Sequence, residues 1–138
     1  MANYSDGLTD LALPKQIDHF VKHGKTASFL SVKPNLTCHF VLMKSNGLVH
    51  EIKNIDKSDI RINGGFFVFR QEIFDYLRPG EELVCEPFQR LIDKKELMAY
   101  KYDGFWACMD TFKDRQMLED LYEKGRAPWE TWKAASPV

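Results

Sequence analysis

Cysteine is scarce in this chain, and its few cysteines form no recognisable pattern. The 138 residues contain only Cys38, Cys85 and Cys108, which are odd in number, far apart and without a Cys-x-x-Cys pair. Neither a disulfide framework nor a zinc knuckle is therefore indicated. We expect reduced thiols that are mostly buried.

Long apolar runs and clusters of like charge are also absent. No apolar run approaches the ~20 residues that a membrane-spanning helix needs, and the first residues do not resemble a signal peptide. A net charge of −1 gives no electrostatic basis for binding nucleic acid or an anionic membrane. We therefore expect a cytoplasmic protein that binds neither of them.

What is present is the composition of a folded domain. Apolar residues make up 44% of the chain and aromatic residues 13%, which argues against disorder. A chain of this length buries roughly two thirds of the surface that its unfolded form exposes. No repeat, linker or low-complexity segment divides it, so we expect a single domain over residues 1–138.

Periodic patterns predict that strands and helices mix within this one unit, which indicates an α/β fold. Strands are expected at 27–32, 37–43, 48–52, 60–69 with an interruption, and 97–102. Helices are expected at 14–23, 72–77, 86–95 and from Thr111 to about Gly125. The inward-facing helix residues are expected to be Ile17, Phe20, Val21, Phe88, Leu91, Ile92, Met117, Leu118, Leu121 and Tyr122.

Two adjacent glycines interrupt one predicted strand. In Asn63-Gly64-Gly65 they indicate either a β-bulge or a backbone that something approaches closely. A ligand is one candidate for that close approach, and a purely structural bulge is the other.

The most informative stretch runs from Asp103 to Leu118. It contains a turn, Trp106, Asp110, and then Thr111 at the start of a helix. An aspartate between a strand end and a helix start is suited to hold magnesium together with phosphates. The alternative is structural, with Trp106 in the core, Thr111 as the N-cap, and Asp110 and Asp114 in solvent.

Several motifs resemble the C-terminal half of the glucose-1-phosphate cytidylyltransferases, which are sugar-1-phosphate nucleotidyltransferases. They agree with that family in order and spacing, and the similarity runs from about Tyr4 to Trp132. The matching segments are 4–10 (YSDGLTD), 62–69 (INGGFFVF), 86–87 (EP), 103–106 (DGFW), 109–111 (MDT) and 125–132 (GRAPWETW).

The resemblance implies a truncated, Rossmann-like nucleotidyltransferase fold, a mixed sheet with flanking helices. The implied reaction joins CTP to a sugar 1-phosphate and releases pyrophosphate, which needs positioning and charge neutralisation more than covalent help. Asp6 and Asp110 match the two aspartates that bind Mg²⁺, and Asn63, Gly64 and Gly65 match a segment near the sugar. No residue is assigned a catalytic role.

The chain departs from the family pattern in three places. The glycine-rich triphosphate loop, with its Arg and a later Lys, has no counterpart. Where the family has Glu-Lys-Pro, this chain has Lys53-Asn54-Ile55, so Lys53 or Lys57 can replace the sugar-phosphate lysine only if the loop shifts. The family's Arg-Phe-Gly is replaced by Thr37-Cys38-His39.

Three interpretations stay open. The chain is one half of a split enzyme whose partner chain carries the triphosphate loop, a non-catalytic binding or scaffolding relative, or a fragment of a longer protein. In each case we expect no activity from this chain alone. We also expect a homo-oligomer, because an exposed strand edge near residues 1–5 favours pairing, and we place Trp129 and Trp132 in packing or interface positions.

Overall fold

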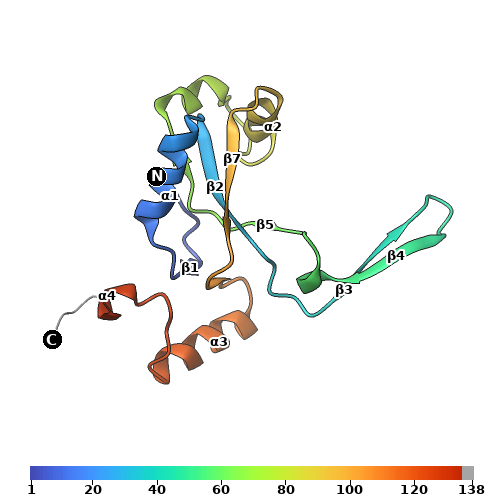
Figure 1. The fold of residues 1–138 in the computed structure, drawn as a ribbon, viewed down its shortest axis with the longest axis vertical. Helices are drawn as coiled ribbons and strands as arrows, with labels where there is room; N and C mark the ends of the chain where they lie inside the picture. The colour runs from blue at the N-terminus through green and yellow to red at the C-terminus, as the bar shows by residue number, and fades with distance from the viewer. Residues whose placement is uncertain (135–138) are drawn as a thin grey trace.

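A mixed sheet centred on one strand forms the body of the protein (Figure 1). The computed structural model describes residues 1–134. Its elements follow in the order β1 (Gly7–Thr9), α1 (Leu13–His23), β2 (Ala27–Val32), β3 (His39–Met43), β4 (Val49–Asn54), η1 (Ile55–Lys57), β5 (Ile62–Asn63), β6 (Val68–Phe69), η2 (Gln71–Tyr76), α2 (Glu86–Asp93), β7 (Leu97–Tyr102), β8 (Trp106–Cys108), α3 (Phe112–Glu123) and α4 (Thr131–Ala134).

Strand β2 lies between partners on both sides. Along one edge it pairs in parallel with β7 over its whole length, from Ala27 opposite Leu97 to Val32 opposite Tyr102. Along the other edge it pairs antiparallel with β5 and then β6. This parallel and antiparallel pairing confirms the expected mixed sheet, and the bounds predicted for β2 and β7 agree with the structure.

Helices cover both faces of β2, as the side-chain alternation of a strand requires. On one face Ala27 and Phe29 pack against Phe88 and Leu91 of α2. The other face carries Leu30 and Val32, which form a second apolar cluster with Leu11, Tyr100, Tyr102 and Trp106. Helix α1 lies on that side, where His19 meets the ring of Tyr100 edge-on. The flanking helices of the predicted fold are therefore present.

Several predicted inward-facing helix residues are exposed. Phe20, Leu91 and Leu118 are buried as expected, but Val21 is 62% exposed, Ile92 54% and Tyr122 61%. The part of each helix that packs against the rest of the protein is therefore narrower than its apolar face. The buried position next to Phe20 belongs to Gln16, whose amide donates to the carbonyl of Phe66 at 2.6 Å.

The prediction that the cysteines are mostly buried is wrong. Cys38 and Cys85 are exposed, and Cys108 is half-buried. Cys38 lies in the connection from β2 to β3, and Cys85 is the residue just before α2. Neither position reaches the cores that form around β2, which explains their exposure.

A β-hairpin projects away from this body (Figure 1). We call residues 39–54 the hairpin arm. Strands β3 and β4 pair only with each other, and Ser45-Asn46-Gly47 makes the predicted turn, with Gly47 at φ +85°.

Thr111 is the N-cap of α3, as expected. Its hydroxyl accepts from the N–H of Asp114, whose carboxylate accepts from the Thr111 N–H in return.

No helix within residues 1–134 has the length and apolar character that crossing a membrane requires.

Candidate metal and sugar-phosphate site

The pairing of β1 with β8 brings Asp6 and Asp110 to the same end of a two-stranded ribbon. Gly7 lies opposite Cys108 and Thr9 opposite Trp106, so the start of β1 is beside the end of β8. Asp6 directly precedes β1, and its carbonyl accepts from the N–H of Met109 at 3.1 Å. Two aspartates that are far apart in the sequence thereby become neighbours.

Both aspartates open into one hollow of about 380 Å³, which we call the site hollow. Its lining consists of Tyr4, Asp6, Gly7, Ile62, Asn63, Gly64, Trp106, Cys108 and Asp110. Four of the predicted site residues, Asp6, Asp110, Asn63 and Gly64, therefore line the same space, and Gly65 follows directly in the chain.

Trp106 fixes one wall of the site hollow. Its indole N–H donates to the carbonyl of Gly64 at 2.8 Å, which ties β8 to the segment between β5 and β6. Asn63 also lines the hollow, and its amide nitrogen donates to the hydroxyl of Tyr4 at 3.2 Å. Its oxygen accepts from the N–H of Gly65 at 3.0 Å. The side chains around the two aspartates are thus held by one another.

The two glycines have a structural explanation. Between the pairs Ser31–Asn63 and Ser28–Val68, the β5–β6 segment contains more residues than β2, which confirms the predicted bulge. A Cβ on Gly64 would lie 3.1 Å from the Trp106 indole nitrogen. At Gly65, which has φ +74°, it would overlap the Asn3 side-chain oxygen. The close approach is made by the protein's own side chains, and contact with a sugar stays a prediction.

Cys108 is a lining residue that sequence reasoning did not single out. Burial raises the pKa of its thiol to about 11, as does the hydrogen bond to Asp110. The protonated thiol donates to Asp110 Oδ2 at 3.1 Å. It therefore occupies one acceptor position of that carboxylate and leaves the others open. Its place inside the Asp103–Leu118 stretch was the signal that could have identified it.

Asp10 has a structural role that the sequence did not reveal. Its carboxylate accepts hydrogen bonds from the Tyr102 hydroxyl and from the N–H of Phe105. Burial and this neighbouring carboxylate raise the pKa of Tyr102 to about 12, so the hydroxyl remains a donor at neutral pH. Asp10 thus fastens the turn before β8, and with it the position of Trp106.

Lys53 is not brought to the site hollow. It lies on β4 opposite Phe40 and forms an ion pair with Glu51. Lys53 and Lys57 both line a different hollow, of about 450 Å³, between the hairpin arm and the segment that follows it. Among residues 1–134, no basic side chain lines the site hollow.

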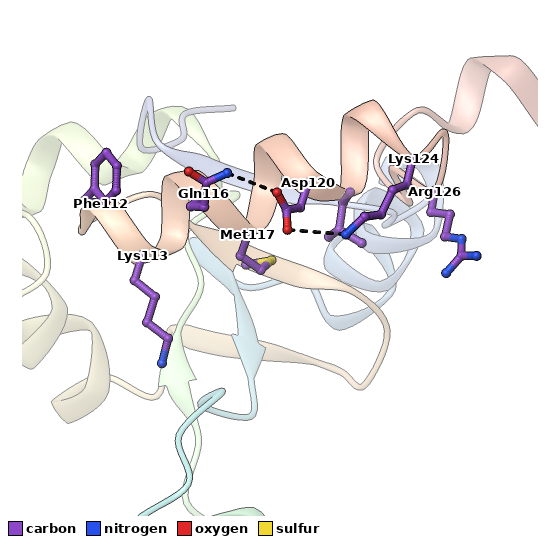
Figure 2. A pocket seen from close by; sticks show the side chains of 8 residues that line it. Phe112, Lys113, Gln116, Met117, Asp120, Lys124 and Arg126 are labelled. Carbon is purple, nitrogen blue, oxygen red and sulfur yellow. Dashed lines mark hydrogen bonds and ion pairs between the residues drawn. The ribbon is translucent and has the colours of Figure 1, made fainter.

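A larger hollow, of about 620 Å³, lies along α3 (Figure 2). None of the predicted site residues lines it. Its polar side chains pair within the helix: Gln116 donates to Asp120 at 3.1 Å, and Lys124 to the same carboxylate at 3.4 Å. Size alone would favour this hollow, but the site hollow contains two carboxylates, Asp6 and Asp110, whose oxygens are suited to bind a metal ion.

The residues of the site hollow fit magnesium by their donor chemistry. Mg²⁺ prefers oxygen ligands and is commonly bound by one or two carboxylates together with substrate phosphates and water. Within residues 1–134 no group of three or more His, Cys, Asp or Glu side chains is placed to hold a metal ion. Asp6 and Asp110 would therefore need a phosphate and water as further ligands.

Comparison with known proteins agrees with the motifs. The chain is 37% identical over 131 residues to a glucose-1-phosphate cytidylyltransferase of Salmonella typhimurium, a match that covers 94% of this chain. It is 29% identical over 134 residues to a probable glucose-1-phosphate cytidylyltransferase of Bacillus subtilis. The resemblance to glucose-1-phosphate cytidylyltransferases is confirmed. No family model matches the chain.

The matches cover only part of the length of each relative. The chain spans about half the length of the curated cytidylyltransferases it matches, 51% and 52% in the two cases. This coverage is consistent with the predicted match to the C-terminal half of the family.

A solved structure supports the fold. A putative glucose-1-phosphate thymidylyltransferase from Bacillus anthracis superposes with a TM-score of 0.57 at 13% identity. The superposition covers 84% of this chain and 51% of that one. At this low identity the likeness concerns the fold, which is that of a nucleotidyltransferase.

Proposed function

We propose that this chain supplies the metal- and sugar-phosphate-binding part of a nucleotidyl-transfer site. The observation that carries the proposal is the joint opening of Asp6 and Asp110 into the site hollow, beside Asn63 and Gly64. The similar proteins are named as glucose-1-phosphate cytidylyltransferases, and we extend that substrate class to this chain.

In this proposal Asp6 and Asp110 would hold Mg²⁺, and the ion would supply positive charge that neutralises the phosphate. Asn63 and the backbone of Gly64 border the space where the sugar would lie. The Cys108 thiol keeps the Asp110 carboxylate oriented by its hydrogen bond. Trp106 holds the Gly64 carbonyl in place and covers one side of the hollow.

The absence of a basic side chain from the lining of the site hollow has a direct consequence. A sugar phosphate entering the hollow would meet two carboxylates and no lysine or arginine. A phosphate and two carboxylates are all negatively charged and repel one another, so binding of the phosphate would require a bound cation. Binding of glucose 1-phosphate should therefore depend on a divalent metal.

Titration calorimetry tests this dependence. We expect glucose 1-phosphate to bind in the presence of Mg²⁺ and to show no measurable binding in EDTA. The Asp110→Asn variant should lose the metal-dependent binding, whereas Asp75→Asn, at an exposed position on η2, should retain it. Equal binding with and without metal would contradict the proposal.

The chain alone is proposed to be inactive, since the matched family's triphosphate loop has no counterpart in it. Incubation with CTP, glucose 1-phosphate and Mg²⁺ should release no pyrophosphate. Addition of a chain that carries the triphosphate loop should restore release if the two form a split enzyme. We also propose that residues 1–138 act as one cytoplasmic domain and that the chain self-associates.

A non-catalytic scaffolding role is the second candidate, and one observation favours it. Lys53 is paired with Glu51 on the hairpin arm instead of facing the site hollow, so the sugar-phosphate lysine of the family has no replacement there. Failure of both metal and glucose 1-phosphate to bind would support the scaffold over the enzyme component.

A further inference from the structure

Helix α1 carries two neighbouring histidines that the proposed function does not use. His19 and His23 are four residues apart, and the centres of their rings lie 4.1 Å apart. Side chains at this spacing are neighbours on one face of a helix. The described residues that line the site hollow include none from α1, so the two imidazoles take no part in the proposed magnesium site.

A hydrogen bond of His23 determines which of its ring nitrogens is free to bind a metal ion. Its Nδ1 lies 2.7 Å from the backbone carbonyl oxygen of His19. Because a carbonyl oxygen can only accept, Nδ1 carries the proton and donates it, and Nε2 keeps its lone pair. Metal-binding histidines commonly donate their other ring N–H in this way. His23 is exposed, so an ion can reach it from solvent.

His19 is half-buried, and its surroundings also favour binding through Nε2. Its Nδ1 is buried without a hydrogen-bond partner in the described part of the chain, and its ring meets Tyr100 edge-on. Burial lowers the pKa of His19, and the positive charges of His23 and Lys22 lower that pKa further. The imidazole is therefore neutral at neutral pH, which is the form that binds metal ions.

We propose that the Nε2 atoms of His19 and His23 together bind one divalent transition-metal ion on the surface of α1. Imidazole suits Zn²⁺, Ni²⁺ and Cu²⁺, and two histidines four residues apart on a helix have the spacing of the zinc-binding His-x-x-x-His pair. Within residues 1–134 no third His, Cys, Asp or Glu side chain joins the pair, so water completes the coordination. Binding is therefore weaker than at a structural zinc site with four protein ligands.

The charged side chains next to the pair are of opposite sign. Asp18 precedes His19 and Lys22 precedes His23, and both charged residues are exposed. Asp18 attracts a cation and Lys22 repels it, so charge alone does not select the ion. The imidazole ligands make the selection, because they favour Ni²⁺, Cu²⁺ and Zn²⁺ over Mn²⁺, whereas Mg²⁺ prefers oxygen ligands. The histidine pair and the Asp6–Asp110 pair therefore differ in the metals they prefer.

Titration calorimetry with Ni²⁺ alone, and separately with Zn²⁺ alone, tests the proposal on the full chain. We expect each metal to show one equivalent that depends on His23. His23→Gln should weaken the binding of that equivalent by about tenfold or more, since the loss of even an outer partner of a metal ligand costs this much. His23 is the position to change because it is exposed, whereas His19 packs against Tyr100.

The other two histidines of the chain provide a matched control. His39 and His50 are exposed on the hairpin arm, on the other side of the body from α1 (Figure 1). His39 lies opposite Asn54, four residues along β4 from His50, so the two are separated by about 13 Å and cannot bind one ion together. The double variant His39→Gln/His50→Gln also removes two imidazoles, yet it should bind Ni²⁺ and Zn²⁺ like the wild type.

Proton NMR with a small amount of Cu²⁺ provides a second readout that identifies the ligands. A bound paramagnetic ion broadens the ring-proton signals of the histidines that hold it. The signals of His19 and His23 should broaden together and before those of His39 and His50. In His23→Gln the early broadening of His19 should be lost.

Two results would overturn the proposal. A wild-type chain that binds neither Ni²⁺ nor Zn²⁺ would exclude the site. Binding that His23→Gln leaves unchanged would place the ion elsewhere, because this variant keeps the exposed thiols of Cys38 and Cys85 as well as Asp6 and Asp110. Neither result bears on the proposed function, which is tested with Mg²⁺ and glucose 1-phosphate.

Discussion

The site hollow and the hairpin arm are built in opposite ways. The hollow is assembled from segments distant in the sequence, with Asp6 at the start of β1, Asn63 in β5 and Asp110 after β8. The arm is a local structure whose strands contact mainly each other. The lining of the hollow therefore depends on long-range pairing in the body, whereas the conformation of the arm depends on its own turn and strand pairing.

The largest predicted effect contrasts the stability of the two regions. Leu30 is fully buried in β2, so Leu30→Ala should reduce the free energy of unfolding by about 3 kcal/mol. Ile52→Ala on the exposed arm should change it by less than about 0.5 kcal/mol. Urea unfolding followed by circular dichroism measures both. A large loss from Ile52→Ala would show that the arm is part of the cooperative core.

A second contrast uses two glycines with similar backbone angles. Gly47, at φ +85° in the arm, has open space around it, so Gly47→Ala should cost about 1 kcal/mol for its left-handed backbone. Gly65→Ala should cost about 1 kcal/mol more, because its Cβ would displace the Asn3 side chain that accepts from the Phe66 N–H at 2.7 Å.

The same unfolding experiment measures this second pair. Equal destabilisation by the two alanine substitutions would mean that the contacts around Gly65 adjust without cost. The site hollow would then be less rigid than its hydrogen bonds indicate.

The smallest expected effect concerns Lys53. Because it is paired with Glu51 and lines a different hollow, Lys53→Ala should change the Mg²⁺-dependent affinity for glucose 1-phosphate by less than about twofold. Calorimetry compares it with Lys57→Ala. A tenfold loss from Lys53→Ala would show that the arm reaches the site when ligand binds, and a tenfold loss from Lys57→Ala would show the same of η1; in either case the contrast between the regions would fail.

The sequence predicted local features well at residues whose type is typical of one structural role, such as a helix start, a helix cap or a turn. Pro14 near the start of α1, Thr111 as a cap and Ser45-Asn46-Gly47 as a turn all have the expected roles. Strand β1 was missed because three residues that begin with glycine carry too little periodicity. Its pairing with β8 is what joins Asp6 to Asp110, and no local pattern encodes such a long-range pair.

The sequence predicted the exposure of helix side chains less well than the positions of the helices themselves. The apolar spacing of α1 and α2 suggested that Val21 and Ile92 face inward, yet both are exposed. Periodicity shows which side of a helix is apolar, but how much of that side is covered depends on neighbouring elements. The resemblance supplied Asp110 and Asp6 as a pair, and the structure shows how β1 and β8 bring them together.

The binding of Mn²⁺ to the Asp6–Asp110 pair is the most direct test of the proposed site. Titration calorimetry of the wild-type chain should show one equivalent bound. Asp6→Asn and Asp110→Asn should each weaken binding by at least about tenfold, while Asp75→Asn binds like the wild type. Binding that survives both substitutions, or a wild-type chain that binds no Mn²⁺ even with glucose 1-phosphate present, would contradict the account.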